Sequence, residues 1–133
     1  MKQIFENVYL IFDLDKENDI FVYTWKLANE NLEIEDFLVE SKKILEGILT
    51  SKCKNIIGND TDFKVIIAPE IQEKMNKTLL FYLNGAILKF AHIIPKELVS
   101  ELSVEQLFEE NSESTYEDKY FETLEQARKW IME

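Results

Sequence analysis

The sequence has 133 residues with 26 acidic and 15 basic side chains, a formal net charge of −11, so its length suits a single domain over residues 1–133. This excess of acid disfavours nucleic acid and anionic membrane surfaces as partners, because both are recognised through clustered Lys and Arg. Three glycines, one cysteine and one histidine also leave too little material for a glycine-rich phosphate loop, a disulfide or a zinc site of the Cys/His type.

The first part of the chain predicts an antiparallel hairpin followed by a helix. Residues 8–13 and 20–25 are rich in β-branched and aromatic side chains, and a polar turn segment at 14–19 separates them. From Ile34 to Leu49, apolar residues recur at the i, i+3, i+4, i+7 spacing of an amphipathic helix. Its acidic residues, Glu40 among them, are expected on the side that faces water.

The middle of the chain alternates strands with helices. Residues 55–59 predict a buried strand, and residues 59–68 predict a loop that inserts side chains into the core. Pro69 suits the first turn of a second amphipathic helix, for which Asn84-Gly85 provides the stop.

The last part continues this alternation. Residues 89–94 predict a strand, after which Pro95 opens a helix with a break near Ser103. Residues 116–121 predict a final strand, and a capping box from Thr123 to Gln126 opens a short last helix. The acidic stretch 105–118 is the most concentrated part of the negative charge.

The resulting order, β-β-α-β-α-β-α-β-α, predicts the α/β class. We expect a single mixed β-sheet that begins with the antiparallel hairpin and continues with parallel β-α units. About four helices should cover it.

Two groups of residues are candidate sites. Asp60, Thr61 and Asp62 follow a buried strand, at the sheet edge where α/β folds place ligands and switches, so this loop could carry a phosphoacceptor or a weak cation site. The alternative is a loop whose side chains only cap backbone N–H groups. Aromatic residues could line a ligand pocket or belong to the core; the candidate pocket residues are Trp25, Phe81 and Phe90.

Other chemistry-bearing residues favour structural roles. Asp13 and Asp15 match the spacing of the haloacid-dehalogenase phosphatase motif, but the Gly-Thr that normally follows is replaced by Lys-Glu, and a hairpin follows instead of a helix. His92 is expected as a hydrogen-bonded strand residue and Cys53 as a buried, inert thiol. We therefore expect no enzymatic activity, no cofactor and no metal.

Several stretches carry a resemblance to a known family: Ala-Pro-Glu-Ile-Gln-Glu at 68–73, Glu-Leu-Ser-Val-Glu-Gln-Leu at 101–107, Tyr-Phe-Glu-Thr-Leu-Glu-Gln-Ala at 120–127, Tyr-Thr-Trp-Lys at 23–26 and Asn-Asp-Thr at 59–61. They resemble small bacterial proteins of the STAS-like (SpoIIAA-like) group, common in Bacteroidetes. The resemblance implies an α/β sandwich with a mixed sheet and a regulatory or binding role. In the anti-sigma-factor antagonists of that group a Ser or Thr after a central strand is phosphorylated, and Thr61 is its closest counterpart here.

Two functions are therefore expected. The first is a non-enzymatic regulatory domain that binds a protein partner or forms a homodimer. The alternative is a carrier of a small apolar ligand or lipid, of the SEC14-like type, with a cavity near the candidate pocket residues. With no apolar leader at residues 1–7 and no apolar run of membrane-spanning length, we expect a cytoplasmic protein.

Overall fold

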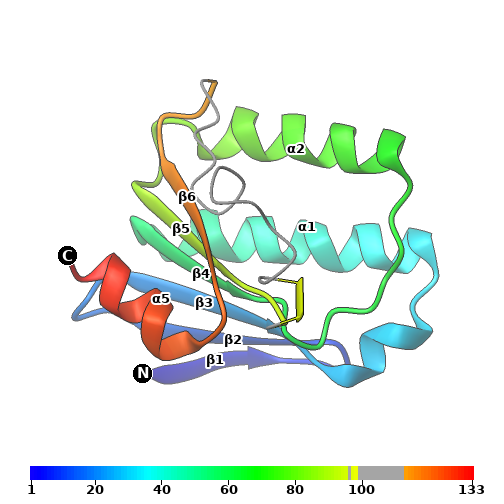
Figure 1. The fold of residues 1–133 in the computed structure, drawn as a ribbon, viewed down its shortest axis with the longest axis horizontal. Helices are drawn as coiled ribbons and strands as arrows, with labels where there is room; N and C mark the ends of the chain where they lie inside the picture. Colours follow the sequence, from blue (N-terminus) through cyan, green and yellow to red (C-terminus); the bar gives the residue numbers. More distant parts are fainter. Residues whose placement is uncertain (96, 99–112) are drawn as a thin grey trace.

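The computed structural model of the protein describes residues 1–95, 97–98 and 113–133. In this part of the chain a six-stranded sheet carries helices on both faces (Figure 1). The elements are, in chain order, β1 (Lys2–Glu6), β2 (Leu10–Asp15), β3 (Ile20–Trp25), the 3-10 helix η1 (Leu27–Asn31), α1 (Ile34–Ser51), β4 (Asn55–Asn59), α2 (Pro69–Leu83), β5 (Lys89–Ile93), β6 (Glu117–Phe121) and α5 (Leu124–Ile131).

The strands lie side by side in chain order, from β1 at one edge to β6 at the other. β1, β2 and β3 pair antiparallel, whereas β3, β4, β5 and β6 pair parallel. The α/β class and the mixed sheet, with its hairpin followed by parallel strands, are confirmed. The described residues contain three α-helices. The helix predicted after Pro95, with its break near Ser103, lies outside the described residues apart from positions 97–98.

β1 is a strand that the sequence did not predict. All five of its residues are exposed, so it shows none of the burial-driven alternation by which strands are recognised. Its pairing with β2 across the sheet edge is what makes it a strand. β2 itself runs to Asp15, so the turn of the predicted hairpin is shorter than residues 14–19.

The core has two layers, one on each face of the sheet. Alternation along β3 sends Phe21 and Tyr23 to the face covered by α1 and α2, and Ile20 and Val22 to the face covered by α5. Because both faces are covered, β3 reads as an almost continuous apolar run. α5 closes its layer with the buried side chains of Ala127, Trp130 and Ile131.

α1 buries Phe37, Ile44 and Ile48 as its periodicity predicts, but Glu40 corrects the expectation of a solvated acidic face. Glu40 is only 4% exposed. Its Oε1 accepts a hydrogen bond of 2.7 Å from Asn7 Nδ2, and its Oε2 lies 2.6 Å from Lys43 Nζ. Asn7 belongs to the turn between β1 and β2, so the burial of Glu40 follows from the strand that the sequence did not show.

Candidate ligand-binding site

The loop between β4 and α2 is held in place by one buried side chain, that of Asn29 in η1. Asn29 Nδ2 donates to the backbone oxygens of Lys26 at 2.5 Å and Asp62 at 2.8 Å, and Asn29 Oδ1 accepts from the backbone N–H of Lys64 at 2.8 Å. Because the bonds to Asp62 and Lys64 go to backbone groups, they fix the course of the chain just after β4.

From this fixed course the loop sends alternate side chains inward. Phe63, Val65 and Ile67 pack against the core, whereas Ile66 is 94% exposed. The ring of Phe63 lies with its centroid 5.3 Å from that of Trp25 and 5.5 Å from that of Phe37. The predicted loop that inserts side chains into the core is thereby confirmed.

A row of residues crosses the parallel strands beneath α1 and α2. The pairing register places Tyr23 of β3 beside Gly58 of β4, Gly58 beside His92 of β5, and His92 beside Tyr120 of β6. Gly58 lies within β4, one residue before its end. A Cβ added to Gly58 would lie 2.5 Å from Tyr23 Cζ and closer still to the hydroxyl oxygen, so the missing side chain makes room for the tyrosine ring.

His92 is fixed within this row by stacking and by a carboxylate. Its ring stacks on Phe90 and on Tyr120, with centroids 4.2 Å and 5.0 Å away. Its Nε2 lies 2.8 Å from Asp118 Oδ1. The predicted hydrogen-bonded strand histidine is therefore confirmed, and it also faces a cavity.

This cavity, called the inner cavity below, has a volume of about 190 Å³ and lies between the sheet and the helices α1 and α2. It is lined by Tyr23, Trp25, Phe37, Ser41, Ile44, Leu45, Ile48, Asp60, Phe63, Ile67, Met75, Leu79, Phe90 and His92. Its walls are thus apolar and largely aromatic, with a few polar groups among them.

Asp60 brings a carboxyl group to this apolar space. Its backbone N–H donates to Ile93 O at 2.8 Å, which fixes the residue at the carboxyl ends of β4 and β5. Burial raises the pKa of Asp60 to about 6, against a smaller lowering by nearby His92. Burial, with a contribution from Asp60, also raises the pKa of Tyr23 well above 10, so the phenol keeps its proton.

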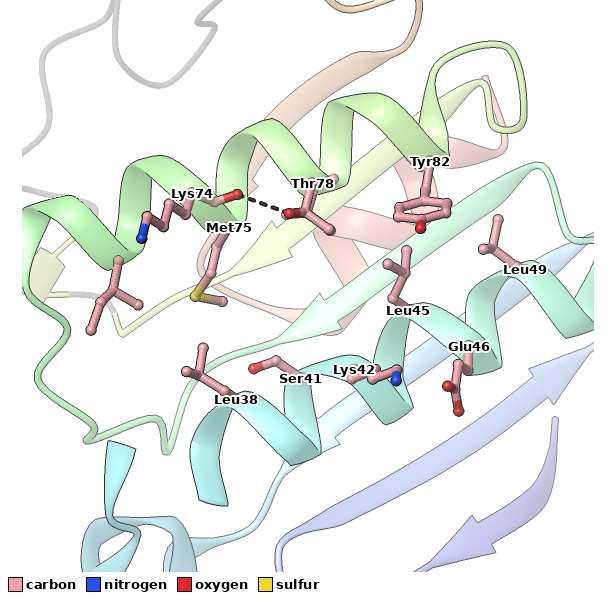
Figure 2. A pocket seen from close by; sticks show the side chains of 12 residues that line it. Leu38, Ser41, Lys42, Leu45, Glu46, Leu49, Lys74, Met75, Thr78 and Tyr82 are labelled. Carbon is pink, nitrogen blue, oxygen red and sulfur yellow. Dashed lines mark hydrogen bonds between the residues drawn. The ribbon is translucent and has the colours of Figure 1, made fainter. Parts of the chain in front are cut away.

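A larger space, called the outer groove, adjoins the inner cavity. It has a volume of about 660 Å³ and is lined by Leu38, Ser41, Lys42, Leu45, Glu46, Leu49, Ile71, Lys74, Met75, Thr78, Leu79 and Tyr82. Figure 2 shows Leu38 and Leu45 of α1 and Met75 and Tyr82 of α2 pointing into the space between the two helices. Four residues line both spaces, namely Ser41, Leu45, Met75 and Leu79, so the groove and the cavity are neighbours.

α2 covers these spaces without filling them. Of its 15 residues only Leu83, at its end, is buried. Met75 and Leu79 reach the core only as partly buried contacts. The apolar stripe predicted for α2 is real, but most of it faces the outer groove.

The predicted site residues separate in the structure. Trp25 and Phe90 line the inner cavity. Phe81 does not: it is 78% exposed, packs edge-on against Tyr82 and lines neither space. In the candidate switch loop, Asp60 lines the cavity, whereas Thr61 is exposed and its Oγ1 donates to Asn59 Oδ1 at 2.7 Å.

Asp15 and Cys53 have structural surroundings. Asp15 Oδ2 accepts from Asn18 Nδ2 at 2.9 Å and from Arg128 Nη2 at 3.0 Å, which ties β2 to α5, and the bond from Asn18 is the main reason that the pKa of Asp15 is lowered. Burial raises the pKa of the Cys53 thiol, as expected for an inert thiol.

Within residues 1–95, 97–98 and 113–133 there is no group of three or more His, Cys, Asp or Glu side chains that could hold a metal ion. None of the helices described in this part of the chain is long and apolar enough to span a membrane. Comparison with protein-family models, with curated proteins and with solved structures finds no match for this chain.

Proposed function

We propose that this protein binds a small, largely apolar molecule in the inner cavity and the outer groove. The observation that carries the proposal is the presence of two adjoining spaces that share four lining residues, one between the helices and one against the sheet. A space of several hundred Å³ with apolar walls and a few convergent polar groups is what small-molecule sites share. This supports the apolar-ligand alternative among the functions expected from the sequence.

The packing of α2 supports the same function. A helix that only covered the core would bury its apolar stripe, since each buried aliphatic side chain stabilises the fold by about 1.5–3 kcal/mol. In α2 that stripe instead lines the outer groove, and Leu83 is the buried residue of the helix. A bound molecule would supply the missing apolar contacts.

Filling the junction of the two spaces tests the proposal. Ser41 lines both, so Ser41→Phe places a ring where the groove meets the cavity. We expect the affinity for the neutral fluorescent probe N-phenyl-1-naphthylamine to fall by about tenfold or more. The measurement is a fluorescence titration of the purified protein, with thermal unfolding to establish that the variant is folded.

Val39→Phe is the matched control, because Val39 lies on the same helix, is exposed and lines neither space. It should bind the probe like the unchanged protein. Saturable binding that Ser41→Phe leaves intact would place the probe elsewhere, and a complete lack of binding would contradict the proposal.

A second candidate function is a regulatory protein-binding domain of the STAS-like type, and one observation favours it. Thr61 lies just beyond the carboxyl end of β4, with its side chain exposed and its hydroxyl oxygen 2.7 Å from Asn59 Oδ1. An exposed hydroxyl after a parallel strand is accessible to a kinase. Phosphopeptide mass spectrometry after incubation with cell extract and ATP should then find phosphate on Thr61 and none in Thr61→Ala; an unmodified Thr61 would count against this function.

A further inference from the structure

We propose that the ligand of the inner cavity is an organic cation, an ammonium ion with apolar substituents, whose charge is bound by Asp60 and the surrounding aromatic rings. This inference rests on the proposed function, because it names the chemistry of the molecule that the cavity would hold. It is carried by the carboxyl group that lines the cavity and by the composition of the walls around it.

The first observation is the carboxyl group of Asp60, which has no hydrogen-bond donor among the described residues. None of the described residues that line the inner cavity is Lys or Arg. The neighbouring His92 is already paired with Asp118, its Nε2 lying 2.8 Å from Asp118 Oδ1. An ionised carboxylate in desolvated surroundings is costly without a counter-charge, and a bound cation would provide it.

The second observation is the ring of aromatic side chains around the same space. Six of the lining residues have aromatic rings, namely Tyr23, Trp25, Phe37, Phe63, Phe90 and His92. The faces of such rings attract cations, and protein sites for quaternary ammonium ligands are built from aromatic rings. A purely aliphatic wall would not distinguish a cation from a neutral molecule, whereas a wall of aromatic rings favours the cation.

The third observation is where cationic side chains do lie. Lys42 and Lys74 line the outer groove but not the inner cavity. An anionic headgroup would therefore meet Asp60 at the inner end and could be bound only at the groove. The Asp60 carboxylate disfavours an anion in the cavity, and the apolar groove is left for the substituents of the cation.

The test compares three ligands with the same chain length, n-octylamine, n-octanol and n-octanoate, by isothermal titration calorimetry at about pH 8, where Asp60 is ionised. We expect octylamine to bind about tenfold tighter than octanol, and octanoate to bind more weakly than either. Asp60→Asn should reduce octylamine binding to the level of octanol and leave octanol binding unchanged.

Asp62→Asn is the matched control, since it removes the same charge two residues along the loop from a side chain that does not line the cavity. It should keep the preference for the amine. Equal binding of octylamine and octanol, or a preference that survives Asp60→Asn, would overturn this inference and leave the proposed function standing. Tightest binding of octanoate would likewise overturn it, and would point to Lys42 and Lys74. Binding of none of the three ligands would contradict the proposed function itself.

Discussion

Replacing Gly58 with alanine is expected to lower the free energy of unfolding by about 3 kcal/mol. The added Cβ would lie 2.5 Å from Tyr23 Cζ, a separation that packed atoms do not tolerate, and both residues are buried at the centre of the sheet. Relief requires the tyrosine ring to leave its place or β3 and β4 to separate. Urea-induced unfolding, followed by tryptophan fluorescence, measures the loss.

Gly47→Ala is a graded comparison for this experiment. Its Cβ would approach the rings of Phe12 and Phe21 to 3.0 Å, a milder overlap, while alanine favours the helix over glycine by about 1 kcal/mol. We therefore expect a much smaller change. If the clash with Tyr23 is the cause, the double variant Gly58→Ala/Tyr23→Ala will lose less stability than the sum of the two single variants, and strict additivity would show that the cause is different.

Asn29→Ala should cost about 3 kcal/mol, because the substitution removes the three hydrogen bonds that this fully buried side chain makes and leaves a void in its place. Two of these bonds, to Asp62 and Lys64, join η1 to the loop that follows β4, and the third, to Lys26, is local to η1. Urea-induced unfolding gives the total loss. Hydrogen exchange should show increased exchange of the Lys64 amide, whose acceptor is Asn29 Oδ1.

Asn31→Ala provides the control for the chemical change, since Asn31 lies in the same 3-10 helix but is exposed. It should alter the free energy of unfolding by less than about 0.5 kcal/mol. A wild-type rate of exchange at Lys64 in Asn29→Ala would mean that the loop is held by Phe63 and its neighbours in the core and not by Asn29.

What could be predicted from the sequence is what depends on local pattern. α1, β4, α2 and α5 begin and end near the expected residues, because apolar periodicity, Pro69, Gly85 and Thr123 act over a few positions. β1 was not predicted, because its stability comes from pairing with β2 and not from an apolar pattern in its own sequence. The burial of Glu40 was not predicted for a related reason, since its hydrogen-bond partner Asn7 is 33 residues away in the sequence.

The candidate site was predictable only in part. Asp60 could be singled out because it follows a buried parallel strand, and Trp25 and Phe90 because of their aromatic rings. Gly58 could not, since its role depends on the register that places Tyr23 beside it. The prediction that Phe81 lines a pocket was wrong because it ignored the helical phase. Phe81 precedes Tyr82 by one residue, a rotation of about 100° around the helix, so its side chain points away from the groove that Tyr82 lines.

Because α2 is only slightly buried, its mobility would control how fast a bound molecule enters and leaves the two spaces. Its ends are fixed, by Pro69 after the anchored loop and by the Asn84 side chain, which accepts from the backbone N–H of Thr115 at 3.1 Å, but its middle makes few buried contacts. Within the part of the chain that the structure describes, the middle of α2 contacts the core only through the partly buried side chains of Met75 and Leu79. If the two spaces hold a ligand as proposed, a local fluctuation of α2 that leaves the sheet intact would let that ligand enter and leave without unfolding of the protein.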